Sequence, residues 1–285
     1  MTTAFFLFGP PGSGKSTLLR HVVPASSAIW YNLLLPKEEE RLIRDPSILL
    51  REVTALPAHI THIVIDEVQK VPAILNIVHH LIETTPKRFL LTGFSSRKLR
   101  HGSASLLAGR ALVFELFPLT SLQFGDDFSL NTVLAFGTLP KSIIAPSDIA
   151  RRFFLQSYAF TYIKEEIKSE KILRNLDYFR KILQVCAQCN GKIINFAAIA
   201  RDFGVDEKTV KNYYFIMEDT HMGFLLEPFQ TSIRKRLNQK PKFYLFDTGN
   251  QRTLAGLLTV PINESTSAFG ELFESFFINE CRRLC

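Results

Sequence analysis

One nine-residue segment limits the folds open to this chain more than any other feature: Gly9-Pro10-Pro11-Gly12-Ser13-Gly14-Lys15-Ser16-Thr17. It matches the phosphate-binding pattern G-x-x-x-x-G-K-[ST]. In this pattern backbone N–H groups surround a phosphate, the lysine reaches the β- and γ-phosphates, and the next hydroxyl binds Mg²⁺. The apolar residues 4–8 predict a buried strand before the segment, and residues 15–22 predict a helix after it. A glycine-rich turn that matches by chance is the alternative, but the order of elements favours a nucleotide-binding α/β domain.

A second apolar run ends in two adjacent carboxylates. Residues 61–65 predict a strand, and Asp66 and Glu67 follow it directly. Because the carboxyl ends of parallel strands meet at one edge of a sheet, we expect both acids beside the phosphate-binding loop. There Asp66 would hold Mg²⁺ together with Ser16, and Glu67 would polarise an attacking water. An ordinary solvated turn is the alternative for two neighbouring acids.

Further apolar runs complete the predicted N-terminal domain. Strands are expected at residues 28–32, 87–92 and 111–116, and a helix with proline in its first turn is expected at residues 72–83. This alternation of strands and helices predicts a parallel sheet with helices on both faces, the α/β fold of a P-loop nucleoside triphosphatase.

Two more residues are candidates for contact with the γ-phosphate. Thr92 ends one predicted strand at the edge where the loop is expected. Arg110 stands just before another strand, where an arginine finger would reach the nucleotide of a neighbouring subunit in a homo-oligomer and contribute roughly 10³–10⁵ in rate. A surface arginine without a catalytic role is the alternative, and Arg97, Lys98 and Arg100 compete for the same role.

Size, charge and cysteine use set the remaining limits. The chain has 285 residues, 46% of them hydrophobic, so we expect at least two domains. No stretch approaches the roughly 18 consecutive apolar residues of a membrane span, and the N-terminus lacks the basic start and cleavage site of a signal peptide. With only four cysteines and a nucleotide site, we expect a cytoplasmic protein. Cys186 and Cys189 form a C-x-x-C; packing on a helix face is favoured over zinc because no second pair has suitable spacing.

The C-terminal half, which carries most of the net charge of +7, predicts a winged helix-turn-helix. Residues 178–186 show helical spacing of apolar side chains, Asn195 and Asp206 are expected to cap a second and a third helix, and Gly204 supplies the turn. Residues 224–229 and 242–246 would form the strands of the wing. The expected DNA contacts are Lys208, Lys211 and Asn212 on the open face of the third helix, and Arg234, Lys235 and Arg236 in the wing. A packing module without DNA is the alternative.

Several motifs together resemble those of prokaryotic AAA-type ATPases that carry a C-terminal domain of unknown function. The motifs are the phosphate-binding loop and residues 66–72, 91–99, 106–110, 116–120, 244–249 and 270–274. The resemblance covers nearly the whole chain and implies ATP and Mg²⁺ as ligands. It also implies a segment before the loop that cradles adenine, a serine where Phe94 stands, and a restriction-endonuclease-like region after residue 280. This chain would contain that last region only in truncated form.

These observations lead to a domain plan and one leading hypothesis. We expect an ATPase domain at residues 1–146, a linker or lid helix at 147–170 that buries Phe153, Phe154 and Tyr158, a winged helix at 171–250, and the truncated start of a further domain at 251–285. The leading hypothesis is a Mg²⁺-dependent ATPase that couples its nucleotide state to the winged helix. Two alternatives stay open: a nucleotide-switched DNA-binding regulator with vestigial hydrolysis, and a small-molecule kinase.

Overall fold

The computed structural model describes residues 4–94, 110–162, 176–229 and 239–284. Its contacts divide the chain into two compact units, Met1–Leu116 and Phe117–Cys285. Each unit has its own core of buried hydrophobic side chains. The first unit therefore ends well before residue 146, where the ATPase domain was expected to end.

The first unit is built on a parallel sheet. Its strands are β1 (Ala4–Phe8), β2 (Ala28–Asn32), β3 (His62–Asp66), β4 (Arg88–Gly93) and β5 (Ala111–Glu115), in the order β2-β3-β4-β1-β5. All neighbouring pairs are parallel, with Phe8 opposite both Gly93 and Glu115. The predicted parallel α/β fold is confirmed, and the strand order places β4 between the strand before the loop and the strand that ends in Asp66.

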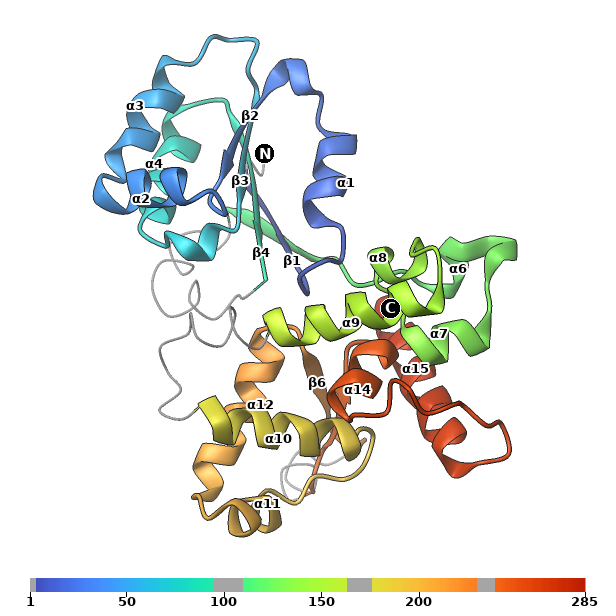
Figure 1. Cartoon of the computed structure of the whole chain (residues 1–285). Helices are drawn as coiled ribbons and strands as arrows, with labels where there is room; N and C mark the ends of the chain where they lie inside the picture. Colours follow the sequence, from blue (N-terminus) through green and yellow to red (C-terminus); the bar gives the residue numbers. More distant parts are fainter. Residues whose placement is uncertain (1–3, 95–109, 163–175, 230–238, 285) are drawn as a thin grey trace. The chain divides into compact units, whose positions relative to one another are not determined.

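Helices cover both faces of this sheet. They are α1 (Lys15–Val22), α2 (Pro36–Arg44), α3 (Ser47–Ala55) and α4 (Ile74–Thr84), with short 3₁₀ turns η1 (Ala25–Ser27) and η2 (Val68–Lys70) between them. Figure 1 shows α1 on one face and α2, α3 and α4 on the other. The main core lies between the sheet and the second group, where Leu42, Leu49, Ile65, Leu75 and Phe89 are fully buried.

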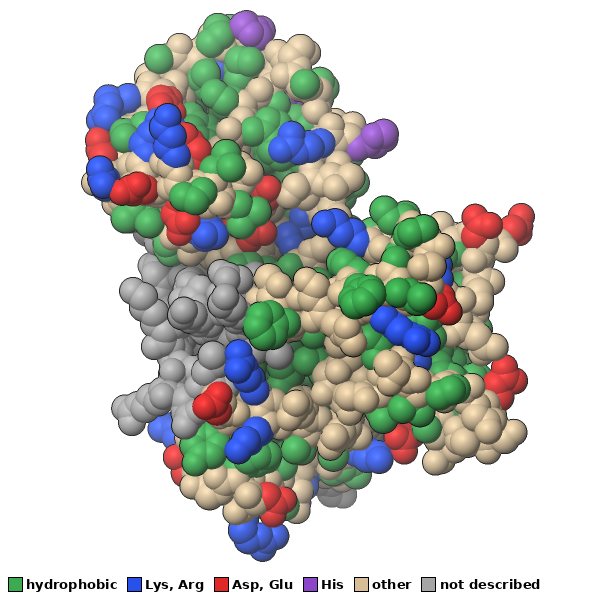
Figure 2. All heavy atoms as spheres, viewed as in Figure 1, with side chains coloured by type: hydrophobic (Ala, Val, Ile, Leu, Met, Phe, Trp, Pro, Cys, Tyr) green, Lys and Arg blue, Asp and Glu red, His purple; other side chains and the backbone are tan. Residues whose placement is uncertain are grey.

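The outer surface of α2 and α3 carries charges of both signs side by side (Figure 2). Arg41 pairs with Glu38 and with Glu52, and Arg51 pairs with Asp45 at 2.9 Å. Such exposed pairs contribute little to stability individually. Because the arginines on this surface are matched by acids, their positive charge is largely neutralised locally.

The second unit is mostly helical. Its helices are α6 (Ser121–Phe124), α7 (Leu130–Phe136), α8 (Pro140–Ile143), α9 (Asp148–Tyr162), α10 (Leu176–Gln188), α11 (Phe196–Phe203), α12 (Glu207–Asp219), α14 (Thr248–Leu254) and α15 (Ser267–Leu284), with a 3₁₀ turn η4 (Gly125–Asp127). Strands β6 (Gly223–Leu226) and β7 (Lys242–Leu245) pair in antiparallel fashion. No described helix is long and apolar enough to cross a membrane.

Helices α10, α11 and α12 and the β6–β7 pair agree closely with the elements expected from the sequence. The Asn195 side chain accepts the N–H of Ala198 at 3.2 Å, and the Asp206 side chain accepts the N–H of Thr209 at 2.6 Å, so both predicted caps are confirmed. Gly204 ends α11 in the left-handed conformation, with φ of 61°. Cys186 is buried in the core against Tyr214, as the packing interpretation of the C-x-x-C expects, whereas Cys189 is exposed.

Helix α9 differs in part from the predicted lid helix. It packs through Leu155 and Ala159, which are buried, and through Phe154 and Tyr158, which contact the same cores. Phe153, also expected inward, is 69% exposed. The inward-facing side chains form two i, i+4 pairs, Phe154 with Tyr158 and Leu155 with Ala159. Residue 153 therefore lies on the outer side of the helix.

Helices α6, α7 and α8 belong to the second unit because their partners lie there. Helix α14 packs against α7, α9 and α10, and the Thr248 hydroxyl donates to the carbonyl oxygen of Val133 at 2.7 Å. The hydrogen bond from Thr248 to Val133 joins residues 115 positions apart, and no local sequence pattern reveals such a contact.

Candidate active site

The loop between β1 and α1 is shaped by glycines in conformations that other residues avoid. Gly9, Gly12 and Gly14 have φ angles of 148°, 74° and 100°. An ideal Cβ on Gly9 would lie 2.1 Å from the carbonyl oxygen of Leu116, whereas one on Gly14 would meet nothing within 4 Å. Gly9 therefore lets the chain pass close to the end of β5, and Gly14 leaves the mouth of the loop open.

Lys15 is folded back across this loop. Its Nζ donates to the carbonyl oxygens of Gly9 at 2.8 Å and Pro10 at 3.1 Å, and the residue is only 5% exposed. The strand-to-helix connection consists of Gly9, Pro10, Pro11, Gly12, Ser13 and Gly14, and Thr17 lies in the first turn of α1. The ammonium group is thus held inside the ring of backbone that a phosphate would occupy.

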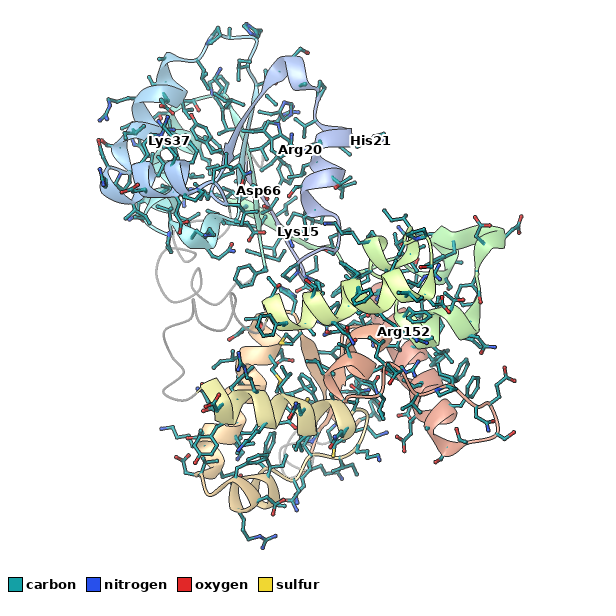
Figure 3. The ribbon with its side chains drawn as sticks, in the orientation of Figure 1. Lys15, Arg20, His21, Lys37, Asp66 and Arg152 are labelled. Atoms are coloured by element: carbon teal, nitrogen blue, oxygen red, sulfur yellow. The ribbon has the colours of Figure 1, made fainter. Side chains whose placement is uncertain are left out.

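Ser16, Asp66 and Thr92 meet at the carboxyl edge of the sheet. The Ser16 hydroxyl donates to Asp66 Oδ2 at 2.8 Å, and the Thr92 hydroxyl donates to Asp66 Oδ1. Figure 3 labels Lys15 on α1 and Asp66 at the end of β3. The strand order explains this meeting, because β4 carries Thr92 between the strand that precedes the loop and the strand that ends in Asp66.

Glu67 directly follows Asp66 in an unusual backbone conformation. Its φ of 62° is left-handed, and its N–H donates to the Thr92 hydroxyl at 3.1 Å. Its carboxylate accepts a hydrogen bond of 2.5 Å from Gln69 Nε2. Burial raises the pKa of the Glu67 carboxyl, and the positive charge of Lys15 opposes that rise. A carboxylate with a raised pKa near a lysine is typical of acid–base sites.

The residues at this edge fit a nucleoside triphosphate with Mg²⁺. The Ser13 hydroxyl is buried and has no hydrogen-bond partner among the described residues, so its donor is available to a ligand in the loop. The oxygens of Ser16 and Asp66 are ligands that Mg²⁺ prefers. Backbone, ammonium and oxygen donors for phosphate and metal are therefore present in one place.

Arg110 lies at the opposite edge of the sheet. It precedes Ala111, which pairs with Ala4 at the amino end of β1, whereas the loop follows the carboxyl end of that strand, roughly 15 Å away. Arg110 is exposed and forms an ion pair of 3.0 Å with Glu83. The structure does not bring it to the loop of its own chain. Arg97, Lys98 and Arg100 lie outside the described residues.

Gln69 is a member of this site that the sequence analysis missed. It is 2% exposed, and its side chain lies between Glu67 and Gly93, at the ends of two strands. The only local signal is its position two residues after Glu67, because the two polar residues between Val68 and Val71 show no periodic pattern.

The residues predicted to contact DNA are only partly described. Lys208 is exposed on α12, and Asn212 is half-buried. Lys211 forms an ion pair of 2.7 Å with Glu207 and lies over the ring of Phe196. Arg234, Lys235 and Arg236 lie outside the described residues. The described part of this surface therefore presents one unpaired lysine, Lys208, with an acidic neighbour at Glu207.

Comparisons with known proteins divide the chain at nearly the same point. Residues 2–124 match a family model described as "AAA domain", and residues 127–260 match one described as "Domain of unknown function (DUF8612)". Uncharacterized proteins of Mycobacterium bovis and Mycobacterium tuberculosis are each 27% identical over 280 residues, which is 98% of this chain and 62% of theirs. The chain thus spans less than two thirds of the length of these relatives.

Among solved structures, the chain is similar to the Aeropyrum pernix ORC1 protein in complex with DNA. The similarity covers 90% of this chain and 86% of that one, with 11% identity and a TM-score of 0.34. The match of residues 2–124 to the AAA-domain model agrees with the parallel sheet of the first unit, and the match of residues 127–260 to the model of unknown function falls within the second unit.

Proposed function

We propose that this protein binds ATP with Mg²⁺ and hydrolyses it in the first unit. One observation carries the proposal: Lys15, Ser16, Asp66, Glu67 and Thr92 come from three separate parts of the chain, and hydrogen bonds link the last four at the end of the sheet that also holds the glycine-rich loop. A structural turn has no need of two carboxylates, a buried ammonium and an open ring of N–H groups together.

Each residue has a distinct role in this proposal. Lys15 exchanges the carbonyl oxygens of Gly9 and Pro10 for phosphate oxygens. Asp66 and Ser16 hold Mg²⁺, which when bound neutralises charge on the β- and γ-phosphates. Glu67 orients the attacking water and accepts its proton, and burial raises the pKa of its carboxyl, which makes it a stronger base than an exposed glutamate. Thr92 fixes Asp66 and the backbone of Glu67 relative to each other.

The test compares ATP turnover in three variants. Lys15→Ala removes the phosphate contact and is expected to lower both affinity and turnover, with turnover falling about 10²–10³-fold. Glu67→Gln keeps the shape of the side chain and is expected to retain binding while losing hydrolysis. Lys37→Ala changes an exposed lysine on α2 and is the control. Wild-type turnover by Lys15→Ala would contradict the proposal.

The proposal extends to the second unit. Helices α10, α11 and α12 followed by the β6–β7 pair have the order of a winged helix, and we propose that this module responds to the nucleotide state. Arg110, exposed and at the far edge of its own sheet, would act only on the nucleotide of a neighbouring copy in a homo-oligomer.

A nucleotide-switched DNA-binding regulator is the second candidate, favoured by the exposed Lys208 on α12 and the basic residues 234–236. Replacing Arg234, Lys235 and Arg236 with Gln is expected to weaken binding to duplex DNA and to reduce the slope of log affinity against log salt by up to about 3. Lys181→Gln on α10 is the control for loss of charge. Absence of DNA binding by the wild-type protein at low salt would exclude this function.

A further inference from the structure

We propose that Gln69 is a positioning residue for hydrolysis: its side-chain amide holds the Glu67 carboxylate in the orientation that the attacking water requires. This inference rests on the proposed ATPase function. It concerns a residue that contacts neither the phosphate-binding loop nor Asp66 in any described hydrogen bond, and acts through Glu67 alone.

The backbone around Glu67 explains why its side chain needs a holder. Among the described residues, only Glu67 and His221 are non-glycine residues with positive φ. The left-handed turn at Glu67 starts the 3₁₀ turn Val68–Lys70 and brings the side chain at position 69 back toward position 67. A strained backbone persists where the surroundings fix it, and such strain gathers at functional sites. The hydrogen bond from Gln69 Nε2 to Glu67 Oε2 is one of the contacts that fix this backbone conformation.

The orientation of the Gln69 amide follows from its partner. An ionised carboxylate can only accept hydrogen bonds, so the NH₂ group must face Glu67 Oε2, as it does at 2.5 Å, and Oε1 must point away. Oε1 is buried and accepts no hydrogen bond from the described residues. A buried acceptor without a donor costs free energy. The amide keeps this orientation because its NH₂ group then donates to Glu67.

Gly93 leaves the space that this arrangement needs. An ideal Cβ at Gly93 would lie 2.5 Å from Gln69 Oε1 and 3.3 Å from the ring of Phe8. Any other residue at position 93 would therefore push the Gln69 amide away from its present place. Gly93 directly follows Thr92, so the end of β4 positions both hydrogen-bond partners of Glu67. The Thr92 hydroxyl accepts the Glu67 N–H, and the Gln69 amide beside Gly93 donates to the Glu67 carboxylate.

Two variants disturb the amide in different ways. Gln69→Ala removes it, and Gly93→Ala displaces its flexible end while leaving the chemistry of residue 69 intact. Both are expected to lower kcat for ATP hydrolysis about 10- to 100-fold, the loss of one hydrogen bond to a charged group, and to change the dissociation constant for ATP less than about threefold. The double variant is expected to be no slower than Gln69→Ala, because the two changes remove the same interaction.

A control variant and the possible outcomes distinguish a positioning role of Gln69 from a structural role. They also distinguish failure of this inference from failure of the proposed ATPase function. Lys37→Ala changes an exposed lysine on α2 and is expected to leave kcat unchanged. Full kcat in Gln69→Ala, or additive losses in the double variant, would overturn the inference while the ATPase stands. A joint loss of ATP affinity and thermal stability would show a structural role and overturn it too. No hydrolysis by the wild-type protein would overturn both.

Discussion

The Thr92 hydroxyl connects the two acids at the end of β3. It donates to Asp66 Oδ1 and accepts the backbone N–H of Glu67 at 3.1 Å. Thr92 is fully buried, so water does not compete for these bonds. One small side chain therefore fixes the carboxylate of Asp66 and the backbone of Glu67. Their relative position cannot change without breaking one of the hydrogen bonds of Thr92.

Removal of this hydroxyl is expected to cost both stability and rate. Thr92→Val keeps the shape of the side chain but leaves the Glu67 N–H without an acceptor, so the free energy of unfolding should fall by about 1–3 kcal/mol, and ATP turnover should fall with it. Thr92→Ser keeps the hydroxyl and should lose about 1 kcal/mol for its missing methyl group. Urea denaturation and phosphate release measure the two effects. Equal losses of turnover in both variants would contradict this role.

At the scale of elements, the loop is held against the strand next to it. Leu116 N–H donates to the carbonyl oxygen of Phe8 at 2.8 Å, and the absence of a side chain at Gly9 allows the close approach to the Leu116 carbonyl. The edge strand β5 thus sets the path by which the chain leaves β1. The start of the phosphate-binding loop is therefore part of the sheet.

Two glycine variants are expected to differ in stability for this reason. Gly9→Ala would place Cβ 2.1 Å from a backbone oxygen, which cannot move without shifting β5, and should cost at least about 2 kcal/mol. Gly14→Ala has the same problem of positive φ but open space, and should cost about 1 kcal/mol. Thermal unfolding of both variants measures the difference. A smaller loss in Gly9→Ala than in Gly14→Ala would show that β5 yields easily.

The elements that the sequence predicts well are those with local causes. The strand before the loop, the helix after it, and the caps at Asn195 and Asp206 depend on neighbours within about four residues, so pattern and position suffice. Asp66 and Thr92 were found because strand ends of a parallel sheet share an edge. That rule needs no knowledge of individual contacts.

The features that escaped prediction depend on partners far apart in the chain. The ion pair of Arg110 with Glu83 and the unit boundary after Leu116 arise from packing that has no local pattern. Gln69 was missed for another reason: a polar residue in a turn usually faces solvent, whereas this one is buried with its Oε1 beside Gly93.

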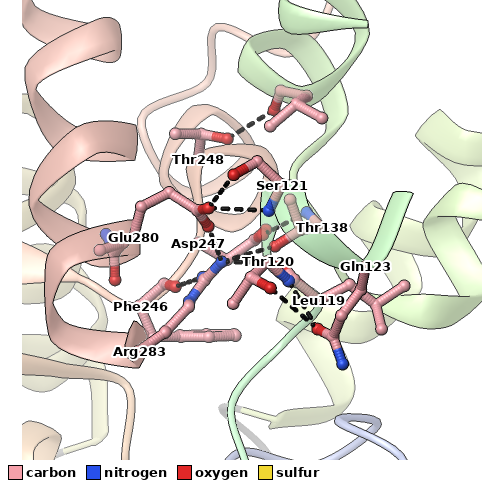
Figure 4. Close-up of polar contacts among 12 residues, drawn as sticks. Leu119, Thr120, Ser121, Gln123, Thr138, Phe246, Asp247, Thr248, Glu280 and Arg283 are labelled. Atoms are coloured by element: carbon pink, nitrogen blue, oxygen red, sulfur yellow. Dashed lines mark hydrogen bonds and ion pairs between the residues drawn. The ribbon is translucent and has the colours of Figure 1, made fainter. Parts of the chain in front are cut away.

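At the scale of the whole molecule, the second unit is tied together by a buried polar network (Figure 4). Arg283 donates to the carbonyl oxygens of Leu119 at 3.0 Å and Phe246 at 2.6 Å, and to the Thr138 hydroxyl at 2.9 Å. Glu280 accepts the N–H and hydroxyl of Ser121 at 2.7 and 2.6 Å. The network therefore joins the first, middle and last segments of this unit.

Asp247 occupies the centre of the same network. It accepts the N–H of Thr138 at 2.7 Å and that of Asn250 at 3.0 Å, and a Cβ at Gly137 would lie 2.0 Å from its Oδ2. Burial raises the pKa of Asp247, and the N–H donors and the charge of Arg283 oppose that rise. The motif at residues 244–249, which contributed to the family resemblance, thus has a structural task in the second unit.

Loss of Arg283 is expected to unfold the second unit selectively. Arg283→Met keeps much of the side-chain volume but leaves the carbonyl oxygens of Leu119 and Phe246 without this donor and the Glu280 carboxylate without its positive partner, so the second unit should lose about 3–5 kcal/mol. Hydrogen exchange read by mass spectrometry should show faster exchange in peptides from residues 117–284 and unchanged exchange in β1, β3 and β4, because the sheet has its own core. Arg201→Met, on the exposed side of α11, is the matched control. Equal loss of protection in both units would mean that the sheet depends on the second unit for its stability.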